Sequence, residues 1–96
     1  MIAEILKSGE KNAMTGRELA QRCGVDIRTI TDQIEKERRA GQPICARSRG
    51  ENCGYFLAET QEELNEYCEA IRKRAGEMFK TRRALLDVKD KLPKAE

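Results

Sequence analysis

The sequence lacks most of the residues that enzymes and metalloproteins use in their sites. Its 96 residues include no histidine and no tryptophan, and aromatic residues make up only 4% of the chain. Without histidine the chain has no Cys–His or Ser–His pair for nucleophilic catalysis, and it has no glycine-rich phosphate-binding loop. We therefore expect no enzymatic activity and no small-molecule substrate.

The four cysteines also lack the spacing of a metal site. Cys23, Cys45, Cys53 and Cys68 include no C-x-x-C pair, whereas structural zinc sites usually contain such close pairs. We therefore expect no metal and no other cofactor. Cys45 and Cys53 flank the segment "ARSRGEN", and we expect them to come near each other on a hairpin.

Long apolar runs are missing as well. No run approaches the roughly 20 residues of a membrane-spanning helix, and the opening "MIAEILKSGE" contains two acids and no small-residue cleavage site. We therefore expect a cytoplasmic protein with reduced thiols and no membrane partner. The net charge is only +2 although 38% of residues are charged, so any nucleic-acid footprint must be local.

The most informative stretch, "TGRELAQRCGVDIRTITDQIEKERRAG", predicts two helices joined by a tight turn. Thr15 and Glu18 form a T-x-x-E capping box at the start of the first helix. Gly24 can take the positive φ that the turn requires, and Asp26 can cap the second helix. On the first helix we expect one buried face, formed by Leu19, Ala20 and Cys23.

The second helix is expected over residues 26–40, before Gly41 and Pro43 stop it. Ile27, Ile30 and Ile34 recur at helical spacing and predict a buried stripe. Two helices joined by a short turn that contains glycine make a helix-turn-helix.

Flanking segments complete the expected domain of residues 1–59. Upstream, "IAEIL" predicts a short helix that Gly9 ends, with "KNAM" as a connector and Met14 turned inward. Downstream, "PICA" and "GYFLA" predict a β-hairpin with the loop "RSRGENC". The expected class is therefore mostly α with one small hairpin.

Residues 60–96 differ in composition and predict one long helix. Thr60 and Glu63 form a second T-x-x-E start, and Pro93 marks the end. A seven-residue repeat indicates a coiled-coil or bundle seam. About 32 helical residues would extend about 48 Å, more than the preceding domain can cover. We therefore expect a homodimer through this helix, with the interface residues Leu64, Tyr67, Ile71, Met78, Leu85 and Leu92.

Two features of this helix carry alternative interpretations. Gly76 costs roughly 1 kcal/mol in a helix interior, and it indicates either a bend or a close contact with a partner helix. The second feature is a basic cluster, which we interpret as a solvated face in preference to a phosphate contact. Its members are Arg72, Lys73, Arg74, Lys80, Arg82 and Arg83.

The order helix, helix-turn-helix, hairpin resembles the winged-helix family, in the version found in the N-terminal repressor domain of biotin-protein ligases. The resemblance covers residues 1–59, and the whole chain resembles small proteins of phages and prophages in Gram-positive bacteria. Matching positions are Leu19, Ala20, Gly24, Val25, Ile30, Ile34, Arg39, Gly41, Ile44, Gly54, Tyr55 and Leu57. The resemblance implies a winged helix-turn-helix that binds double-stranded DNA sequence-specifically, as a dimeric transcriptional regulator.

Such a protein would insert the helix of residues 26–40 into the major groove, N-terminal end first. Arg28 can donate two bonds to guanine and Gln33 can pair with adenine. Thr15 and Arg17 would hold the backbone, and arginines of the hairpin would reach a minor groove or phosphates. The expected DNA-binding residues are Thr15, Arg17, Arg28, Thr29, Thr31, Gln33, Lys36, Arg47 and Arg49.

Acidic residues keep other functions open. Asp32, Glu35 and Glu37 lie on or near the expected recognition helix. They suit a winged helix that binds another protein, as an adaptor or antirepressor. A phage replication or excision accessory protein is a further alternative that uses the same DNA chemistry.

Overall fold

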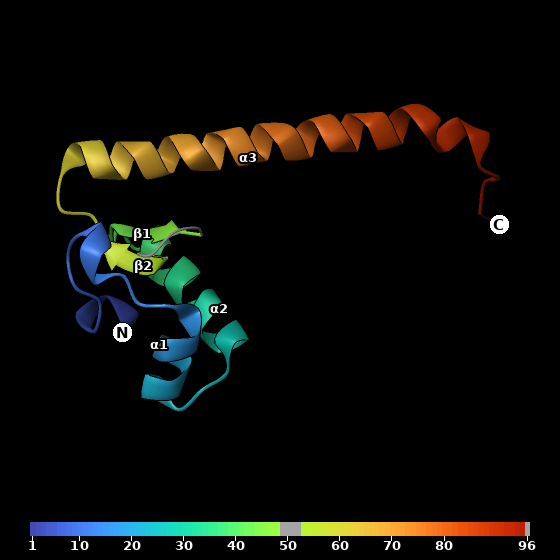
Figure 1. Ribbon diagram of the computed structural model, residues 1–96. Coiled ribbons are helices and arrows are strands. Elements are labelled where there is room, and N and C mark those ends of the chain that lie inside the picture. Colours follow the sequence, from blue (N-terminus) through green and yellow to red (C-terminus); the bar gives the residue numbers. More distant parts are fainter. Residues whose placement is uncertain (49–52, 96) are drawn as a thin grey trace.

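The computed structural model describes residues 1–48 and 53–95, and Figure 1 shows a small head beneath one end of a long helix. The head, residues 1–59 without 49–52, contains two helices and an antiparallel hairpin. This confirms the expected class, mostly α with a small hairpin and a long C-terminal helix. The main elements are α1 (Gly16–Cys23), α2 (Ile27–Arg39), β1 (Ile44–Arg47), β2 (Gly54–Leu57) and α3 (Gln61–Val88), with 3-10 turns η1 (Ile2–Glu4), η2 (Glu10–Asn12) and η3 (Lys89–Lys91).

The start of α1 and the turn into α2 form as the sequence predicts. The Glu18 N–H donates to Thr15 Oγ1 at 3.1 Å, and the Thr15 N–H donates to Glu18 Oε1 at 3.3 Å, which completes the capping box. Gly24 has φ 68°, the left-handed conformation that ends α1. The Thr29 N–H donates to Asp26 Oδ1 at 2.8 Å and caps α2.

The core lies where α1, α2 and the hairpin meet. Leu19, Ile30, Ile34 and Ile44 are almost completely buried and pack in one cluster with Ile2, Leu6 and Ala20. Burying a large aliphatic side chain contributes about 1.5–3 kcal/mol, so this cluster sets the angle between α1 and α2.

Two residues expected in the core are exposed. Cys23 is exposed because it is the last residue of α1, one turn beyond the contact that Leu19 and Ala20 make. Ile27 is 52% exposed because it begins α2, at the edge of the buried stripe. The expectation of an Ile27 core position is therefore wrong, while Ile30 and Ile34 are confirmed.

The hairpin does not bring the two cysteines together. Its register places Cys45 opposite Phe56, so Cys45 and Cys53 are offset by three residues, about 10 Å along a strand. Cys45 is buried and Cys53 is half-buried, and both are free thiols. The expected proximity is therefore wrong, because residues on the two strands of a hairpin come close only where the register sets them opposite each other.

The segment before α1 pairs with the hairpin instead of forming the expected helix. The Gly9 N–H donates to the Leu57 carbonyl at 2.9 Å, and the Leu57 N–H donates to the Lys7 carbonyl at 3.0 Å. Only the turns η1 and η2 are helical in residues 1–14. The short-helix prediction is wrong because these backbone groups bond to β2, which a local apolar pattern does not reveal.

Met14 makes a second contact with β2 and explains Gly54. The Met14 N–H donates to the Tyr55 carbonyl at 2.9 Å, and the Tyr55 N–H donates back at 2.7 Å. Gly54 has φ 126°, and a Cβ there would lie 2.4 Å from the Met14 carbonyl oxygen. Only glycine fits at this crossing.

Helix α3 begins as expected and ends slightly earlier. The Glu63 N–H donates to Thr60 Oγ1 at 3.1 Å, which caps the helix. Its 28 residues end at Val88, and η3 continues toward Leu92, so the helix that was expected to reach Leu92 is shorter. The chain measures 51 × 32 × 28 Å, with α3 along the long dimension. Within residues 1–48 and 53–95, no helix is long and apolar enough to cross a bilayer.

Candidate nucleic-acid interface

One face of α2 is exposed along the whole helix. Arg28, Thr29 and Thr31 are exposed in its first turns, and Lys36 is exposed further along. The Thr31 hydroxyl donates to the Ile27 carbonyl at 3.1 Å. The opposite face is fixed by Ile30 and Ile34, which are each 1% exposed. Four of the side chains expected to contact DNA therefore come from one rigid element. Acids share this surface, because Asp32 and Glu35 are exposed too.

Gln33 does not lie on the outward face where we expected it. It is half-buried, and its Nε2 donates to Glu37 Oε2 at 2.9 Å. Because the Gln33 side-chain amide is bound to Glu37, contact with an adenine would require this hydrogen bond to break. Its base-reading role stays a prediction.

Glu37 is a buried carboxylate that connects α2 to the start of the chain. It is 2% exposed and accepts hydrogen bonds from the Ile2 and Ala3 N–H groups, both at 2.7 Å. Burial raises its pKa, but the hydrogen bonds from Ala3, Ile2 and Gln33 outweigh burial, so the pKa is lowered from 4.5. The charge faces the core and not a DNA surface.

A sequence signal for this burial exists, although the sequence reading treated Glu37 only as an acid near the recognition helix. Ile30, Ile34 and Glu37 recur at i, i+4 and i+7, so Glu37 continues the buried stripe. An acid on an apolar stripe requires donors that face it, and here the first turn of the chain supplies them.

The start of α1 offers one free cation. Arg17 is exposed in the first turn, whereas the Thr15 side chain is half-buried and engaged in the capping box with Glu18. Nearby, hydrogen bonds from Thr29 hold the pKa of Asp26 below its ordinary value of 3.8. An ionised Asp26 stabilises the N-terminus of α2, and it also places a negative charge at the end that would enter the groove.

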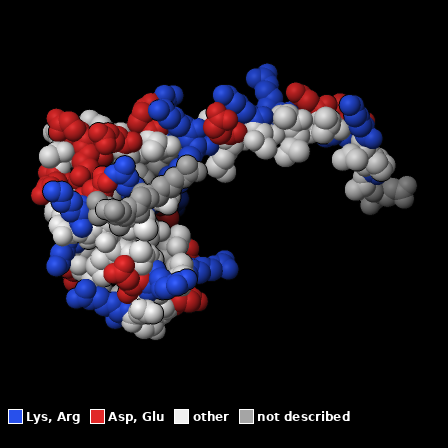
Figure 2. All heavy atoms as spheres, in the orientation of Figure 1, with Lys and Arg blue, Asp and Glu red and all other residues white. Residues whose placement is uncertain are grey.

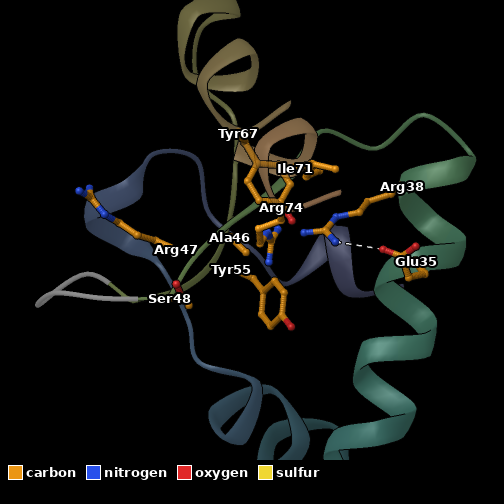
Figure 3. Close-up of a pocket in the computed structure, with 10 residues that line it drawn as sticks. Glu35, Arg38, Ala46, Arg47, Ser48, Tyr55, Tyr67, Ile71 and Arg74 are labelled. Atoms are coloured by element: carbon orange, nitrogen blue, oxygen red, sulfur yellow. Dashed lines mark hydrogen bonds and ion pairs between the residues drawn. The ribbon is translucent and has the colours of Figure 1, made fainter. Parts of the chain in front are cut away.

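The hairpin arginines differ in position from what we expected. Arg47 forms an ion pair with Glu10 of η2, and Figure 3 shows its side chain extending to the side away from α2. Contact with DNA therefore requires the ion pair to open, which costs little because surface pairs contribute about 0–1 kcal/mol. Arg49 lies outside the described residues.

Arg38 joins α2, the hairpin and α3. Its Nε donates to the Ile44 carbonyl at 2.9 Å and its Nη1 pairs with Glu35 at 3.1 Å. The guanidinium carbon lies 5.0 Å from the Tyr67 ring centroid and 5.9 Å from that of Tyr55. Arg38 is therefore held by the head and by α3, and it is not a solvated side chain at the end of α2.

Around Arg38 the three elements enclose an open groove of about 650 Å³. Its remaining lining includes Ala46, Tyr67, Ile71 and Arg74, so one wall is the face of α3 that meets the head. In Figure 3 the labelled side chains of Tyr67, Ile71 and Arg74 extend from α3 into the groove.

Acidic side chains occupy the other end of the head. Glu10, Glu59, Glu63 and Glu66 line two shallow depressions between η2 and the start of α3. Figure 2 shows a red region at the upper left, at the start of α3, while blue and red side chains are mixed at the lower end with α1 and α2. Acidic side chains therefore predominate at the end of the head away from α1 and α2.

Comparisons with protein-family models, with curated proteins and with solved structures find no match to this chain. Within residues 1–48 and 53–95, no three His, Cys, Asp or Glu side chains gather as a metal site would require. A function for this chain is therefore inferred from the geometry of α1, α2 and the hairpin.

Proposed function

We propose that this protein binds double-stranded DNA sequence-specifically, as a dimeric transcriptional regulator with a winged helix-turn-helix head. The observation that supports this most is the form of α2. It starts directly after a tight turn, its inner face is locked to α1, and its outer face carries Arg28 in the first turn. A recognition helix needs this combination of rigidity and exposed donors near its N-terminus.

Each exposed side chain then has a role of its own. Arg28 donates two hydrogen bonds to a guanine in the major groove. Thr29 and Thr31 contact phosphate or a thymine methyl group, and Lys36 and Arg17 bind phosphates on either side. The acids at the start of α3 face away from this surface and keep the bound duplex at the α1–α2 end.

Dimerisation is assigned to the apolar stripe of α3. Met78 and Leu85 are 73% and 65% exposed, although they continue the line of Leu64 and Tyr67, which are half-buried against the head. Leu92, which follows η3, is 69% exposed. Large apolar side chains exposed in sequence along one helix mark an interaction surface. A two-fold dimer predicts a palindromic site.

Fluorescence anisotropy with a mixed-sequence duplex tests the proposal. Affinity should fall steeply between about 50 and 200 mM salt, because counterions are released when basic side chains bind phosphates. Arg28→Ala should lose about 1–3 kcal/mol of discrimination at one base position. Arg83→Ala, an exposed arginine of α3, is the matched control and should bind as the wild type does. Salt-independent binding, or an Arg28→Ala variant equal to Arg83→Ala, would refute the proposal.

A protein-binding role is the second candidate, supported by the acids on the same surface. Asp26, Asp32 and Glu35 are exposed on α2 or at its cap, and the net charge is only +2. An adaptor or antirepressor would bind a basic partner surface through these side chains. Asp32→Asn separates the two functions, since it should strengthen binding to DNA and weaken binding to a basic partner.

A further inference from the structure

The apolar stripe of α3 changes from covered to exposed along its length. Leu64 and Tyr67 are half-buried on the head, Ile71 is 41% exposed and Met78 is 73% exposed. Figure 1 shows α3 continuing well past the head, with nothing beneath its C-terminal half. We call residues 71–92 the overhang. Its stripe is widened by a second apolar column, because Phe79 and Leu86 are 67% and 43% exposed.

We infer that the overhang pairs with the overhang of a second copy in antiparallel orientation, so that the two heads lie at opposite ends of the dimer. This arrangement rests on the dimerisation proposed above, and it does not depend on DNA binding.

The position of the head decides the orientation. The head packs on the same stripe that continues into the overhang, since Leu64 and Ile71 are seven residues apart on α3. In a parallel pair both heads would lie at the same end and on the facing sides of the two helices. Each head would then occupy the space that the first turns of the other copy need. An antiparallel pair that overlaps only through the overhangs avoids this clash.

The apolar side chains fit the antiparallel register. When Met78 of one copy faces Leu85 of the other, the two-fold axis repeats this contact with the copies exchanged, so four large exposed side chains meet at the centre of the seam. In the same register Ile71 lies opposite the end of the second copy's η3, after which Leu92 is extended. The end of the second copy therefore lies beside Ile71, which lines the groove next to Tyr67.

Charge distribution points the same way. The stretch of residues 72–74 carries three consecutive bases, and a parallel pair would set this stretch against its own copy. In the antiparallel register, in which Met78 faces Leu85, it faces residues 89–91, where Asp90 lies between Lys89 and Lys91. Like charges placed opposite each other weaken an association, so the antiparallel pair sets fewer like charges against residues 72–74 than the parallel pair does.

Site-directed disulfide formation in the full chain tests the orientation. The background carries Cys23→Ser, Cys53→Ser and Cys68→Ser, and the buried Cys45 is kept. Ala75→Cys and Val88→Cys are then made separately in this background. A disulfide requires Cα atoms within about 7 Å. Two copies of residue 75 would lie about 20 Å apart in the antiparallel pair, whereas residue 75 of one copy faces residue 88 of the other.

The antiparallel dimer predicts that neither variant forms a disulfide dimer alone under mild oxidation and that an equimolar mixture forms the 75–88 disulfide. Disulfides between two copies of residue 75 or two copies of residue 88, or none in the mixture, overturn the inference. Sedimentation equilibrium of the wild type is run in parallel, and a monomer there overturns the pairing itself. DNA binding is read separately by anisotropy on the same proteins, so the failure of that function stays distinguishable.

Discussion

Replacing Glu37 by glutamine tests the assignment of this acid to the core. The carboxylate accepts three hydrogen bonds, at 2.7, 2.7 and 2.9 Å. An amide has one oxygen to accept and no charge, so at least one of the buried backbone N–H groups loses its partner. Hydrogen bonds to charged groups contribute about 1.5–3 kcal/mol, and an unsatisfied buried donor costs about 1–3 kcal/mol. We expect Glu37→Gln to lower the free energy of unfolding by about 2–4 kcal/mol.

Urea denaturation followed by circular dichroism measures this change. Asp32→Asn is the matched control, because it removes a carboxylate from the same helix at an exposed position. Exposed substitutions of this kind stay within about 0.5 kcal/mol. If Glu37→Gln shifts the urea midpoint no more than Asp32→Asn does, the buried hydrogen bonds of Glu37 do not stabilise the head as described.

The pH dependence supplies a second readout of the same substitution. The pKa of Glu37 is lowered in the folded protein, because the hydrogen bonds from Ala3, Ile2 and Gln33 outweigh the effect of burial. A lowered pKa stabilises the fold above the unfolded-state value of about 4.5, and this stabilisation is lost as pH falls through the folded-state pKa. The difference between wild type and Glu37→Gln should therefore narrow below about pH 4.5. A difference that stays constant down to pH 3 would contradict this.

Three further predictions concern the hairpin, α3 and the thiols. Gly54→Ala should destabilise the head by about 2 kcal/mol or more, since it combines backbone strain with a steric clash. Gly76→Ala, which has open space around it, should stabilise α3 by up to about 1 kcal/mol. Thermal melts compare the two variants, and equal melting temperatures would refute the clash at Gly54. Met78→Lys combined with Leu85→Lys should give a monomer by sedimentation equilibrium with the helix content retained, and a persistent dimer would disprove the seam. Burial raises the pKa of the Cys45 thiol from 9.0 to about 11. This thiol should resist iodoacetamide at pH 8 until denaturant is added, because the thiolate is the reactive form. Modification of Cys45 in the native protein, detected by mass spectrometry, would contradict its burial.

Features that depend only on local sequence were predictable. The capping box at Thr15, the Thr60 cap of α3, the turn at Gly24 and the strands of the hairpin each depend on a few neighbouring residues. The same reasoning places Ile30 and Ile34 inside, because the 3.6-residue period repeats over a whole helix. The same prediction fails at Ile27, because the helical period continues to this residue but the surface that covers Ile30 and Ile34 does not.

Features that depend on distant pairing were not predictable from these patterns. The segment at Lys7 and Gly9 bonds to β2, about 50 residues away along the chain, and this contact replaces a helix that the apolar spacing favoured. Arg38 and Glu37 look like solvated charges in sequence. Their partners come from the hairpin, from α3 and from the first turn of the chain, and no local pattern specifies those partners.

The candidate site also combines features that local sequence predicts with features that depend on distant residues. The exposure of Arg28 and Lys36 follows from the helical period of α2. The engagement of Gln33 with Glu37, and of Arg47 with Glu10, depends on tertiary neighbours and reduces the set of side chains that stand free for DNA. The remaining free donors concentrate on α2 and on Arg17 at the start of α1.

Selection from a randomised duplex pool tests whether the protein binds DNA sequence-specifically through α2. The immobilised wild-type protein is incubated with the pool at physiological salt, and the bound DNA is amplified and sequenced over several rounds. Sequence-specific binding through α2 predicts enrichment of one sequence family that contains a guanine position, and Arg28→Ala should relax the preference at that position. A pool that stays random after selection, or a motif that Arg28→Ala leaves unchanged, would contradict the account.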